Sequence, residues 1–437
     1  MAKKSLPEVT VTLDRIIGGG QTIGTLSDGK KCLVWGGLPD EEVTVQLTKK
    51  KSSYVEGYVT NVITPSHERT EPRDPGSFLS TSPWQIMNFS AEKHYKAALI
   101  EEAFELHDIV LPVPIDVWSD GREYEYRNKV EFSFWYDTEK EELDLAFFRR
   151  GTHGKITVQG TSLATSDINN AANYALQALR DLKVDGRSLK TLLIRCNRAG
   201  KVAWQLYVKD EEFDANAVLE KAIAPEVICA EVIFSNPKSP ASVITKRLAS
   251  SSNDTLTDTI LDVPFRYATE GFFQINLPVY EQALSDMKEW VVADKPVVDL
   301  YSGVGTIGLT IGGSDVTLVE LNEHAVREME RNVAELHRVT EVKPILAASE
   351  NALDYITGDA TIIVDPPRAG LHEKVVEKLL VAAPERIIYL SCNPVTQARD
   401  VALLSEKYGI RHHRGYNFFP RTPHIEHLVV LDVIQKM

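Results

Sequence analysis

The sequence is poor in cysteine, and its cysteines are far apart. Only four occur among 437 residues: Cys32, Cys196, Cys229 and Cys392. This spacing fits neither a disulfide-rich scaffold nor a zinc or iron–sulfur ligand cluster. We therefore expect a protein of a reducing compartment, and the cytoplasm is the simplest one.

Long apolar runs and an excess of positive charge are also missing. No run approaches the roughly 20 apolar residues that span a bilayer, and the first ten residues, MAKKSLPEVT, lack the apolar segment of an export signal. Lys and Arg number 48 against 62 Asp and Glu, which gives a net charge of −14. These features predict no membrane attachment and argue against coating nucleic acid by bulk charge. A local basic surface is still allowed.

The first sixty residues have the pattern of a small β-barrel. Five short stretches between residues 8 and 63 alternate apolar and polar side chains, and GGG, SDGK and GGLPDE separate several of them. Lys49, Lys50 and Lys51 fall between the fourth and fifth predicted strands, beside Tyr54. They are equally compatible with a solvated turn and with a phosphate contact.

The rest of the chain divides into two further regions. Residues 67–83 have the composition of a linker and precede a predicted helix at 91–106, and strands and helices follow up to about residue 263. From 264 on, β-branched strands alternate regularly with helices, which is typical of a doubly wound parallel sheet. We therefore expect an α/β protein with a barrel (1–66), a central α+β domain (67–263) and a C-terminal doubly wound domain (264–437).

A glycine-rich loop follows the first strand of the C-terminal region. Gly303, Gly305 and Gly308 match GxGxxG between a predicted strand and a predicted helix, and Glu320 ends the next strand. Such a loop lets backbone approach a ligand, and the carboxylate can accept hydrogen bonds from a ribose diol. An NAD dehydrogenase and an S-adenosylmethionine enzyme both show this pattern, and tight-turn glycines that serve only packing are the plainer alternative.

Two later strand ends carry further chemistry. DPPRAG (365–370) and SCNP (391–394) each close an apolar strand. Because parallel strands end at the same edge of a sheet, we expect Asp365 and Cys392 to lie beside the glycine loop. A lone cysteine is usually a buried small residue, but this position favours a reactive thiol.

These motifs together resemble the RNA uracil-5 methyltransferase family. The resemblance spans GFFQIN (271–276), DLYSGVGTIGL (299–309), VELN (319–322), DPPRAG, SCNP and HIEH (424–427), and YRNKVEFSF (126–134) is similar to a strand of the family's central domain. The N-terminal barrel resembles the TRAM domain, an RNA-binding module. The resemblance implies transfer of a methyl group from S-adenosylmethionine to carbon 5 of a uridine in RNA.

The implied reaction explains why these residue types are needed. Carbon 5 of uracil is a poor nucleophile until a thiolate, here that of Cys392, adds to carbon 6. A base must then remove the proton from carbon 5, and Glu426 matches the family's proton acceptor. An exposed strand carboxylate is the plainer interpretation of Glu426, and His424 and His427 are assigned no role.

The resemblance also implies a set of methyl-donor contacts. They are Gln274, Tyr301, Gly303, Thr306 and Glu320, with Asp365 between donor and target base. Thr306 lies at a position where the family varies. Gln274 and Asn276 have an alternative role as caps of the following helix.

In one respect the sequence departs from the family. Many members hold an iron–sulfur cluster on four cysteines, three of them just before the first long helix, where this chain reads FLSTSPWQIMNFSAEKHYK. We therefore predict no iron–sulfur cluster and no other metal. The sequence does not indicate what replaces it.

Four other functions compete with this one. An RNA cytosine-5 methyltransferase typically has Pro-Cys after the Asp, whereas Arg368 follows Pro367 here, and an exocyclic-nitrogen methyltransferase has an aromatic residue after Asp-Pro-Pro. A silent RNA-binding factor would have no need of Cys392 and Glu426. An NAD dehydrogenase would need neither DPPRAG nor SCNP.

The substrate is expected to be structured RNA, bound by the barrel, the central domain and the active-site cleft. The target uridine must leave its stack, so it should lie in a loop or be flipped out. The barrel favours a uridine of 23S ribosomal RNA, and the T-loop uridine of transfer RNA is the alternative. We expect a monomer.

Overall fold

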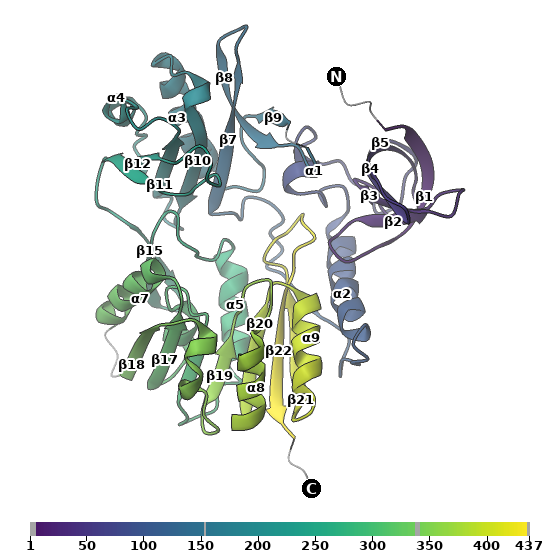
Figure 1. Ribbon diagram of the computed structural model, residues 1–437, viewed down its shortest axis with the longest axis vertical. Coiled ribbons are helices and arrows are strands. Elements are labelled where there is room, and N and C mark those ends of the chain that lie inside the picture. Colours follow the sequence, from purple (N-terminus) through teal and green to yellow (C-terminus); the bar gives the residue numbers. More distant parts are fainter. Residues whose placement is uncertain (1–5, 153, 337–340, 435–437) are drawn as a thin grey trace.

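The computed structural model describes residues 6–152, 154–336 and 341–434. Three sheets dominate the molecule: a closed barrel, a seven-stranded sheet and an eight-stranded sheet (Figure 1). The predicted α/β class with an N-terminal barrel is therefore confirmed. Within these ranges no helix has both the length and the apolar character needed to cross a membrane.

The N-terminal barrel is closed by five strands in the order β1-β2-β3-β5-β4. Its bounds are β1 Glu8–Ile16, β2 Thr22–Thr25, β3 Lys31–Trp35, β4 Glu42–Lys50 and β5 Tyr54–Thr64. Alternate side chains point inward, and a core that includes Val34, Val43 and Val45 fills the interior. One expectation needs correction: Lys49 and Lys50 belong to β4, and Lys49 forms an ion pair with Glu56 across the sheet, N–O 2.7 Å.

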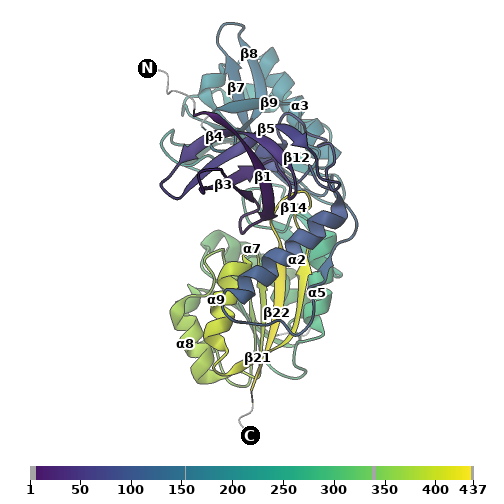
Figure 2. The same ribbon diagram turned by 90° about the vertical axis from the view of Figure 1, so that its right-hand side faces the viewer.

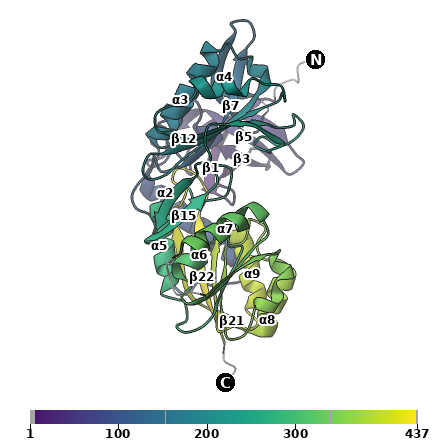
Figure 3. The same cartoon turned by 90° about the vertical axis from the view of Figure 1, so that its left-hand side faces the viewer.

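Helices cover one face of the central sheet, and the other face is only partly covered. The strand order of the sheet is β13-β12-β11-β10-β7-β8-β9. The strands are β7 Lys129–Asp137, β8 Glu142–Phe148, β9 Lys155–Val158, β10 Leu189–Cys196, β11 Val202–Val208, β12 Val227–Phe234 and β13 Lys246–Ser250. Helices α3 Ser166–Asp181 and α4 Ala215–Lys221 pack on one face, where alanines of α3 allow close approach. The other face looks toward the barrel, which lies behind the sheet in Figure 3.

The C-terminal sheet runs β18-β17-β16-β19-β20-β22-β21-β6. Its strands are β16 Val297–Leu300, β17 Asp315–Glu320, β18 Glu341–Leu346, β19 Thr361–Val364, β20 Arg386–Ser391, β21 Tyr408–Tyr416 and β22 Glu426–Val433, with the short β6 Val117–Trp118. Helices α5 Leu277–Lys288, α6 Thr306–Ile311, α7 Glu323–Glu335, α8 Glu373–Ala382 and α9 Pro394–Leu404 accompany them. Five neighbouring strands are parallel, but β22 is antiparallel to both β20 and β21. The expected parallel sheet therefore ends in an antiparallel hairpin, and Glu426 begins its last strand.

Three segments from the predicted central region pack with the C-terminal sheet instead. Helix α2 (Phe89–Glu105) lies against α9 (Figure 2), and β6 pairs with β21. The hairpin β14 (Leu256–Ile260) and β15 (Val263–Tyr267) contributes to the C-terminal core. Periodicity shows that a helix has an apolar face, but it does not show which sheet that face will cover. The short α1 (Phe78–Thr81) precedes α2.

Candidate active site at the edge of the C-terminal sheet

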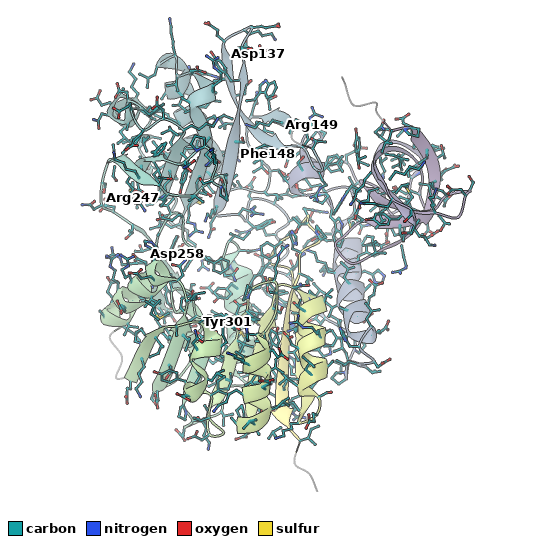
Figure 4. All side chains as sticks on the ribbon, in the orientation of Figure 1. Asp137, Phe148, Arg149, Arg247, Asp258 and Tyr301 are labelled. Carbon is teal, nitrogen blue, oxygen red and sulfur yellow. The ribbon has the colours of Figure 1, made fainter. Side chains whose placement is uncertain are left out.

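A cavity of about 680 Å³ lies where the parallel strands of the C-terminal sheet end. Figure 4 labels Tyr301 at this edge, directly after β16. The residues that line the cavity and carry polar or aromatic groups include Phe272, Gln274, Tyr301, Glu320, Asn322, His324, Asp365, Arg368, Cys392, Phe419, His424 and Glu426. The site thus gathers residues from sequence motifs more than 150 positions apart, as crossover connections in such sheets allow.

The glycine loop and Glu320 form one side of the cavity. The Glu320 carboxylate accepts hydrogen bonds from the backbone N–H groups of Gly303 at 2.9 Å and Asn322 at 2.7 Å. Gly303 has φ 59° and open space where a Cβ would stand, so a ligand can approach its backbone. Gly308 serves packing, because a Cβ there would lie 2.3 Å from the Leu318 side chain. The packing interpretation of the glycine motif therefore applies to Gly308. The geometry of Gly303 is compatible with the ligand-binding interpretation.

Beneath this loop, Asp299 is completely buried. One of its oxygens accepts a hydrogen bond from the Gly308 N–H at 2.9 Å, and the other has no partner among the described residues. Burial raises the pKa of Asp299 to about 8, and the nearby Asp365 and Glu320 add to the rise. Asp299 therefore retains a proton in much of the neutral range.

Asp365 and Glu426 form a second group of carboxyls in the cavity. Glu426 is only 4% exposed, so the interpretation as an exposed strand carboxylate is wrong. Burial raises the pKa of Asp365 to about 7. The pKa of Glu426 is raised well above its ordinary value by burial and by the charge of Asp365, while Arg368 opposes the rise. Two adjacent carboxyls in a cavity cannot both ionise easily, so the pair holds a proton near neutral pH.

Cys392 differs from the other three cysteines because it lines the cavity and is partly exposed. Cys32, Cys196 and Cys229 are buried. Burial raises the pKa of the Cys392 thiol to about 12; the carboxyls of Glu426 and Asp365 add to this, and Arg368 opposes it. The thiol is therefore protonated in the protein alone, and a cation bound in the cavity would lower its pKa.

The remaining predicted donor contacts are divided between the cavity and its surroundings. Gln274 and Tyr301 line the cavity. Thr306 does not, since it begins α6 and its hydroxyl lies 2.7 Å from that of Tyr280. Asn276 is the N-cap of α5 by position, but its side chain makes no capping bond and its Nδ2 donates to the Phe418 carbonyl instead.

Some residues to which the sequence assigned no role also line the cavity. Phe272 is 71% exposed at its rim. The Arg368 guanidinium lies 3.2 Å from His424 Nδ1. Burial lowers the pKa of His424 to about 4 and Arg368 adds to this, so His424 is neutral. Arg368 follows Asp-Pro-Pro and could have been selected on that ground, whereas no local signal pointed to Phe419 or His424. His427, considered as a surface residue, is fully buried.

No group of three or more His, Cys, Asp or Glu in the described parts of the chain has an arrangement that could hold a metal ion. The residues that are present do fit an S-adenosylmethionine-sized ligand with a ribose. An oriented carboxylate, an open glycine backbone and buried acidic groups suited to a cation share one cavity.

The fold and this site define the class of S-adenosylmethionine-dependent methyltransferases with a doubly wound catalytic domain. The sequence profile of the tRNA (uracil-5-)-methyltransferase family matches residues 94–434, and the chain belongs to this family. It is an RNA uracil-5 methyltransferase that uses S-adenosylmethionine.

Similar proteins agree with this assignment. Uncharacterised RNA methyltransferases are 27% identical in Enterococcus faecalis, over 90% of each chain, and 26% identical in Thermotoga maritima, over 96% of this chain and 98% of the other. The crystal structure of Pyrococcus abyssi tRNA (uracil-54, C5)-methyltransferase in complex with S-adenosyl-L-homocysteine has a similar fold. It is 21% identical with a TM-score of 0.78, covering 97% of this chain and 100% of that one.

Proposed function

We propose that Cys392 and Glu426 carry out methylation of a uridine in RNA. The observation that supports this is that Cys392, the one partly exposed thiol among the four cysteines, lines the same cavity as the glycine loop and the carboxyls of Asp365 and Glu426. The thiol provides the covalent step, and a carboxylate provides the base.

The proposed reaction begins at carbon 6 of the target uracil. The Cys392 thiolate adds to carbon 6 of the uracil, and the electron pair of the ring double bond makes carbon 5 nucleophilic. S-adenosylmethionine, when bound, supplies an electrophilic methyl group and a positive charge. Carbon 5 would take this methyl group, the sulfur–methyl bond would break, and neutral S-adenosylhomocysteine would be left. The Glu426 carboxylate then takes the proton from carbon 5. The ring double bond re-forms and the carbon–sulfur bond breaks, which returns Cys392 as a thiolate.

The protonation states suggest how the site is kept inactive until it is filled. In the protein alone, Cys392 and the Asp365–Glu426 pair hold protons. A cation in the cavity favours the ionised forms of all three groups. We propose that donor binding therefore ionises the residues that the reaction needs ionised.

The proposed donor-binding residues are Gln274, Tyr301, Gly303, Glu320 and Asp365. Glu320 is held by two backbone N–H groups in an orientation from which its free lone pairs can accept hydrogen bonds from a ribose diol. Thr306 is outside the cavity, so for it we propose only support of α6 through Tyr280. Phe272, exposed at the rim, is suited to stack on an RNA base.

The partly covered face of the central sheet is the proposed path of the RNA. Lys129 donates to the carbonyls of Glu270 and Gly271, which line the catalytic cavity, and a neighbouring cavity of about 360 Å³ includes Lys129 and Glu131. Glu131 also lines the next cavity, of about 580 Å³. We propose that these neighbouring hollows together form a trough for RNA along β7.

Cations and aromatic side chains accompany this trough. Seven cations lie in or beside it, and none is within 4.0 Å of a carboxylate in the ranges that the structure describes: Arg127, Lys129, Arg149, Arg150, Lys155, Lys190 and Lys209. Trp135 (44% exposed) and Phe148 (55%) provide stacking surface. Figure 4 shows Phe148 and Arg149 on the side nearer the barrel. Such a surface is suited to RNA phosphates and unstacked bases.

We propose three functional domains: the RNA-binding TRAM-like barrel 1–66, the central domain within 67–263 and the methyltransferase domain from 264. We propose that α2, β6 and the β14–β15 hairpin belong functionally to the methyltransferase domain, because α2 packs on α9, β6 pairs with β21 and the hairpin contributes to the C-terminal core. All four cysteines are free thiols, which supports a reducing cytoplasm. Because one chain supplies all of these surfaces, we propose that it acts as a monomer.

The proposed target is a uridine of 23S ribosomal RNA, as the barrel and the long basic trough suggest. The alternative is a transfer RNA T-loop uridine. It is favoured by the fold match to the Pyrococcus tRNA enzyme, which also covers the barrel. Both targets require the same catalytic residues.

One experiment tests both the chemistry and the target. The protein would be incubated with S-adenosylmethionine and cellular RNA containing 5-fluorouridine, from which the base cannot remove fluorine as a cation. We expect a covalent protein–RNA adduct at Cys392 that Cys392→Ala cannot form, and sequencing the attached RNA identifies the target. A wild-type protein that binds the donor but forms no adduct with any RNA would overturn the proposed mechanism.

A further inference from the structure

Two buried charged residues on α2 hold the segment that enters the active site. Glu92 and Lys96 lie one helical turn apart, and both are 0% exposed. Lys96 Nζ donates to Glu92 Oε1 at 3.0 Å, to Asn417 Oδ1 at 2.6 Å and to the Phe419 carbonyl at 3.0 Å. The Glu92 carboxylate accepts from Asn417 Nδ2 at 2.9 Å and from the Arg421 backbone N–H at 3.0 Å. The pair thus binds both ends of the turn 417–421.

The conformation of the turn 417–421 depends largely on residues outside it. It follows β21 and precedes β22, so no sheet ladder supports it, and Arg421 has a positive φ of 65°. Groups from outside the turn complete its hydrogen bonds: the Met87 carbonyl accepts from the Arg421 guanidinium, and the Tyr126 hydroxyl donates to the Pro420 carbonyl. Its shape therefore depends on residues that are distant in sequence.

The turn and the residues after it belong to the catalytic cavity. Phe419 and His424 line it, and Glu426 begins β22 immediately afterwards. Neither Glu92 nor Lys96 lines the cavity. The donor side, with Gly303 and Glu320, follows β16 and β17, and in the described parts of the chain neither residue forms a hydrogen bond with Glu92 or Lys96.

Stability alone is a poor reason to bury such a pair. Removing two charges from water is costly, and well-packed apolar residues of similar volume are often at least as stabilising. The attested advantage of a buried ionic network is that it fixes one arrangement. Here every hydrogen-bonding proton of the Lys96 ammonium is directed to a partner, and two of the three partners belong to the turn.

We propose that Glu92 and Lys96 are positioning residues that set the turn 417–421, and through it Phe419 and His424, in the geometry required for attack on the base. This inference rests on the proposed function. The proposed role of α2 concerns the methylation step and does not concern donor binding. Misplacement of reacting groups by about 1 Å can slow a reaction by roughly 100-fold.

The test uses the full-length double variant Glu92→Gln/Lys96→Met. Changing Lys96 alone would leave the buried Glu92 carboxylate with only the more distant Arg421 guanidinium, at 3.8 Å, and could unfold the protein. The double change removes both charges of the Glu92–Lys96 pair at nearly constant volume. Lys93→Met is the matched control, since Lys93 is on the same helix and outside the network. The measurements are the melting temperature, the dissociation constant for S-adenosylhomocysteine, kcat and KM for methylation, and the rate of adduct formation with 5-fluorouridine RNA.

We expect the double variant to be folded and to bind S-adenosylhomocysteine within about twofold of wild type, while kcat and the adduct rate fall by about tenfold or more. Lys93→Met should match wild type in all measurements. A folded double variant with wild-type kcat and adduct rate would overturn the positioning role, as would a loss confined to ligand affinity or melting temperature. Absence of any Cys392 adduct in wild type would instead contradict the proposed function, so the two failures are distinguishable.

Discussion

The two halves of the catalytic cavity are built in different ways. On the donor half, the Glu320 carboxylate is fixed by backbone N–H groups of the loop and turn that follow two adjacent strands, β16 and β17. On the reacting half, Asp365, Cys392 and Glu426 follow or begin three other strands, and their side chains face one another. Backbone N–H groups therefore organise the donor half, whereas the reacting half is a cluster of side chains.

This difference has an electrostatic consequence. The Glu320 carboxylate accepts two backbone hydrogen bonds. Burial raises the pKa values of Asp365, Cys392 and Glu426, and neighbouring carboxyls add to the rise for Cys392 and Glu426. Under the proposed function, the donor half would accept hydrogen bonds from a neutral sugar and the reacting half would be ionised by a cation. Substitutions should therefore separate binding from chemistry.

The largest effect is expected for Cys392→Ala. Without the thiol, carbon 5 is not activated, so methylation should fall by about 10⁴-fold or more. S-adenosylhomocysteine affinity should stay close to wild type, because the donor half is intact. Radiolabelled methyl transfer and calorimetric titration measure the two quantities. Cys229→Ala is the control, and residual methylation within tenfold of wild type would contradict a nucleophilic role for Cys392.

Glu426→Gln should block a later step than Cys392→Ala does, namely removal of the proton from carbon 5. The amide nearly preserves the size of the side chain but cannot accept the carbon 5 proton, so turnover should fall by about 10²- to 10⁴-fold. Thiol addition and methylation can still occur, and a covalent protein–RNA complex should accumulate on ordinary uridine RNA. Denaturing gels would show this complex. A slow variant that never accumulates it would argue that Glu426 acts before methylation.

Glu320→Gln should weaken donor binding and spare the chemical step. Loss of charge-assisted hydrogen bonds predicts a rise of about 10- to 100-fold in the KM for S-adenosylmethionine. With saturating donor, kcat should remain near that of wild type. A matched change at Glu323, which begins α7 beyond the cavity lining, should have no effect. A fall in kcat with unchanged KM would place Glu320 on the reacting half.

The trough along the central sheet predicts a smaller effect that depends on salt. Changing Lys155, Lys190 and Lys209 together to alanine should raise the KM for RNA. The plot of log affinity against log salt concentration should become less steep, its slope falling in magnitude by about two to three. Donor affinity should not change. The control changes three lysines of α5 and α8 (Lys288, Lys374 and Lys378). Equal effects in the two triple variants would show only a loss of overall charge.

The sequence predicted the placement of the glycine loop and Glu320 on one cavity, because its signals there are local. A glycine loop between a strand and a helix and a carboxylate at the next strand end fix their own geometry, as Gly303 and Glu320 show. Asp365 and Cys392 were placed correctly in the cavity by the rule that parallel strands end at one edge. The barrel was likewise predicted from alternation and turns.

What the sequence could not show depends on long-range packing. Lys96 follows helical periodicity like any exposed lysine, and only the fold reveals that it meets Asn417, more than 300 residues away. The packing of α2 against α9 of the C-terminal sheet could not be predicted for the same reason. The donor contact of Thr306 stays a prediction, and the structure adds a hydrogen bond between its hydroxyl and that of Tyr280.

The smallest predicted effect concerns the dependence of stability on pH. The folded-state pKa of Asp299, about 8, lies above the ordinary value of 3.8, so between these values the folded protein retains a proton that the unfolded chain has lost. The free energy of unfolding should therefore decrease as pH rises through this window. Asp299→Asn keeps an acceptor for the Gly308 N–H and removes the titration, so its melting temperature should fall less than that of wild type between pH 5 and about 8. Parallel melting curves for both proteins without ligand would reveal this. Identical pH slopes would mean that Asp299 is already ionised in the folded protein and contributes nothing to the loss of stability between pH 5 and about 8.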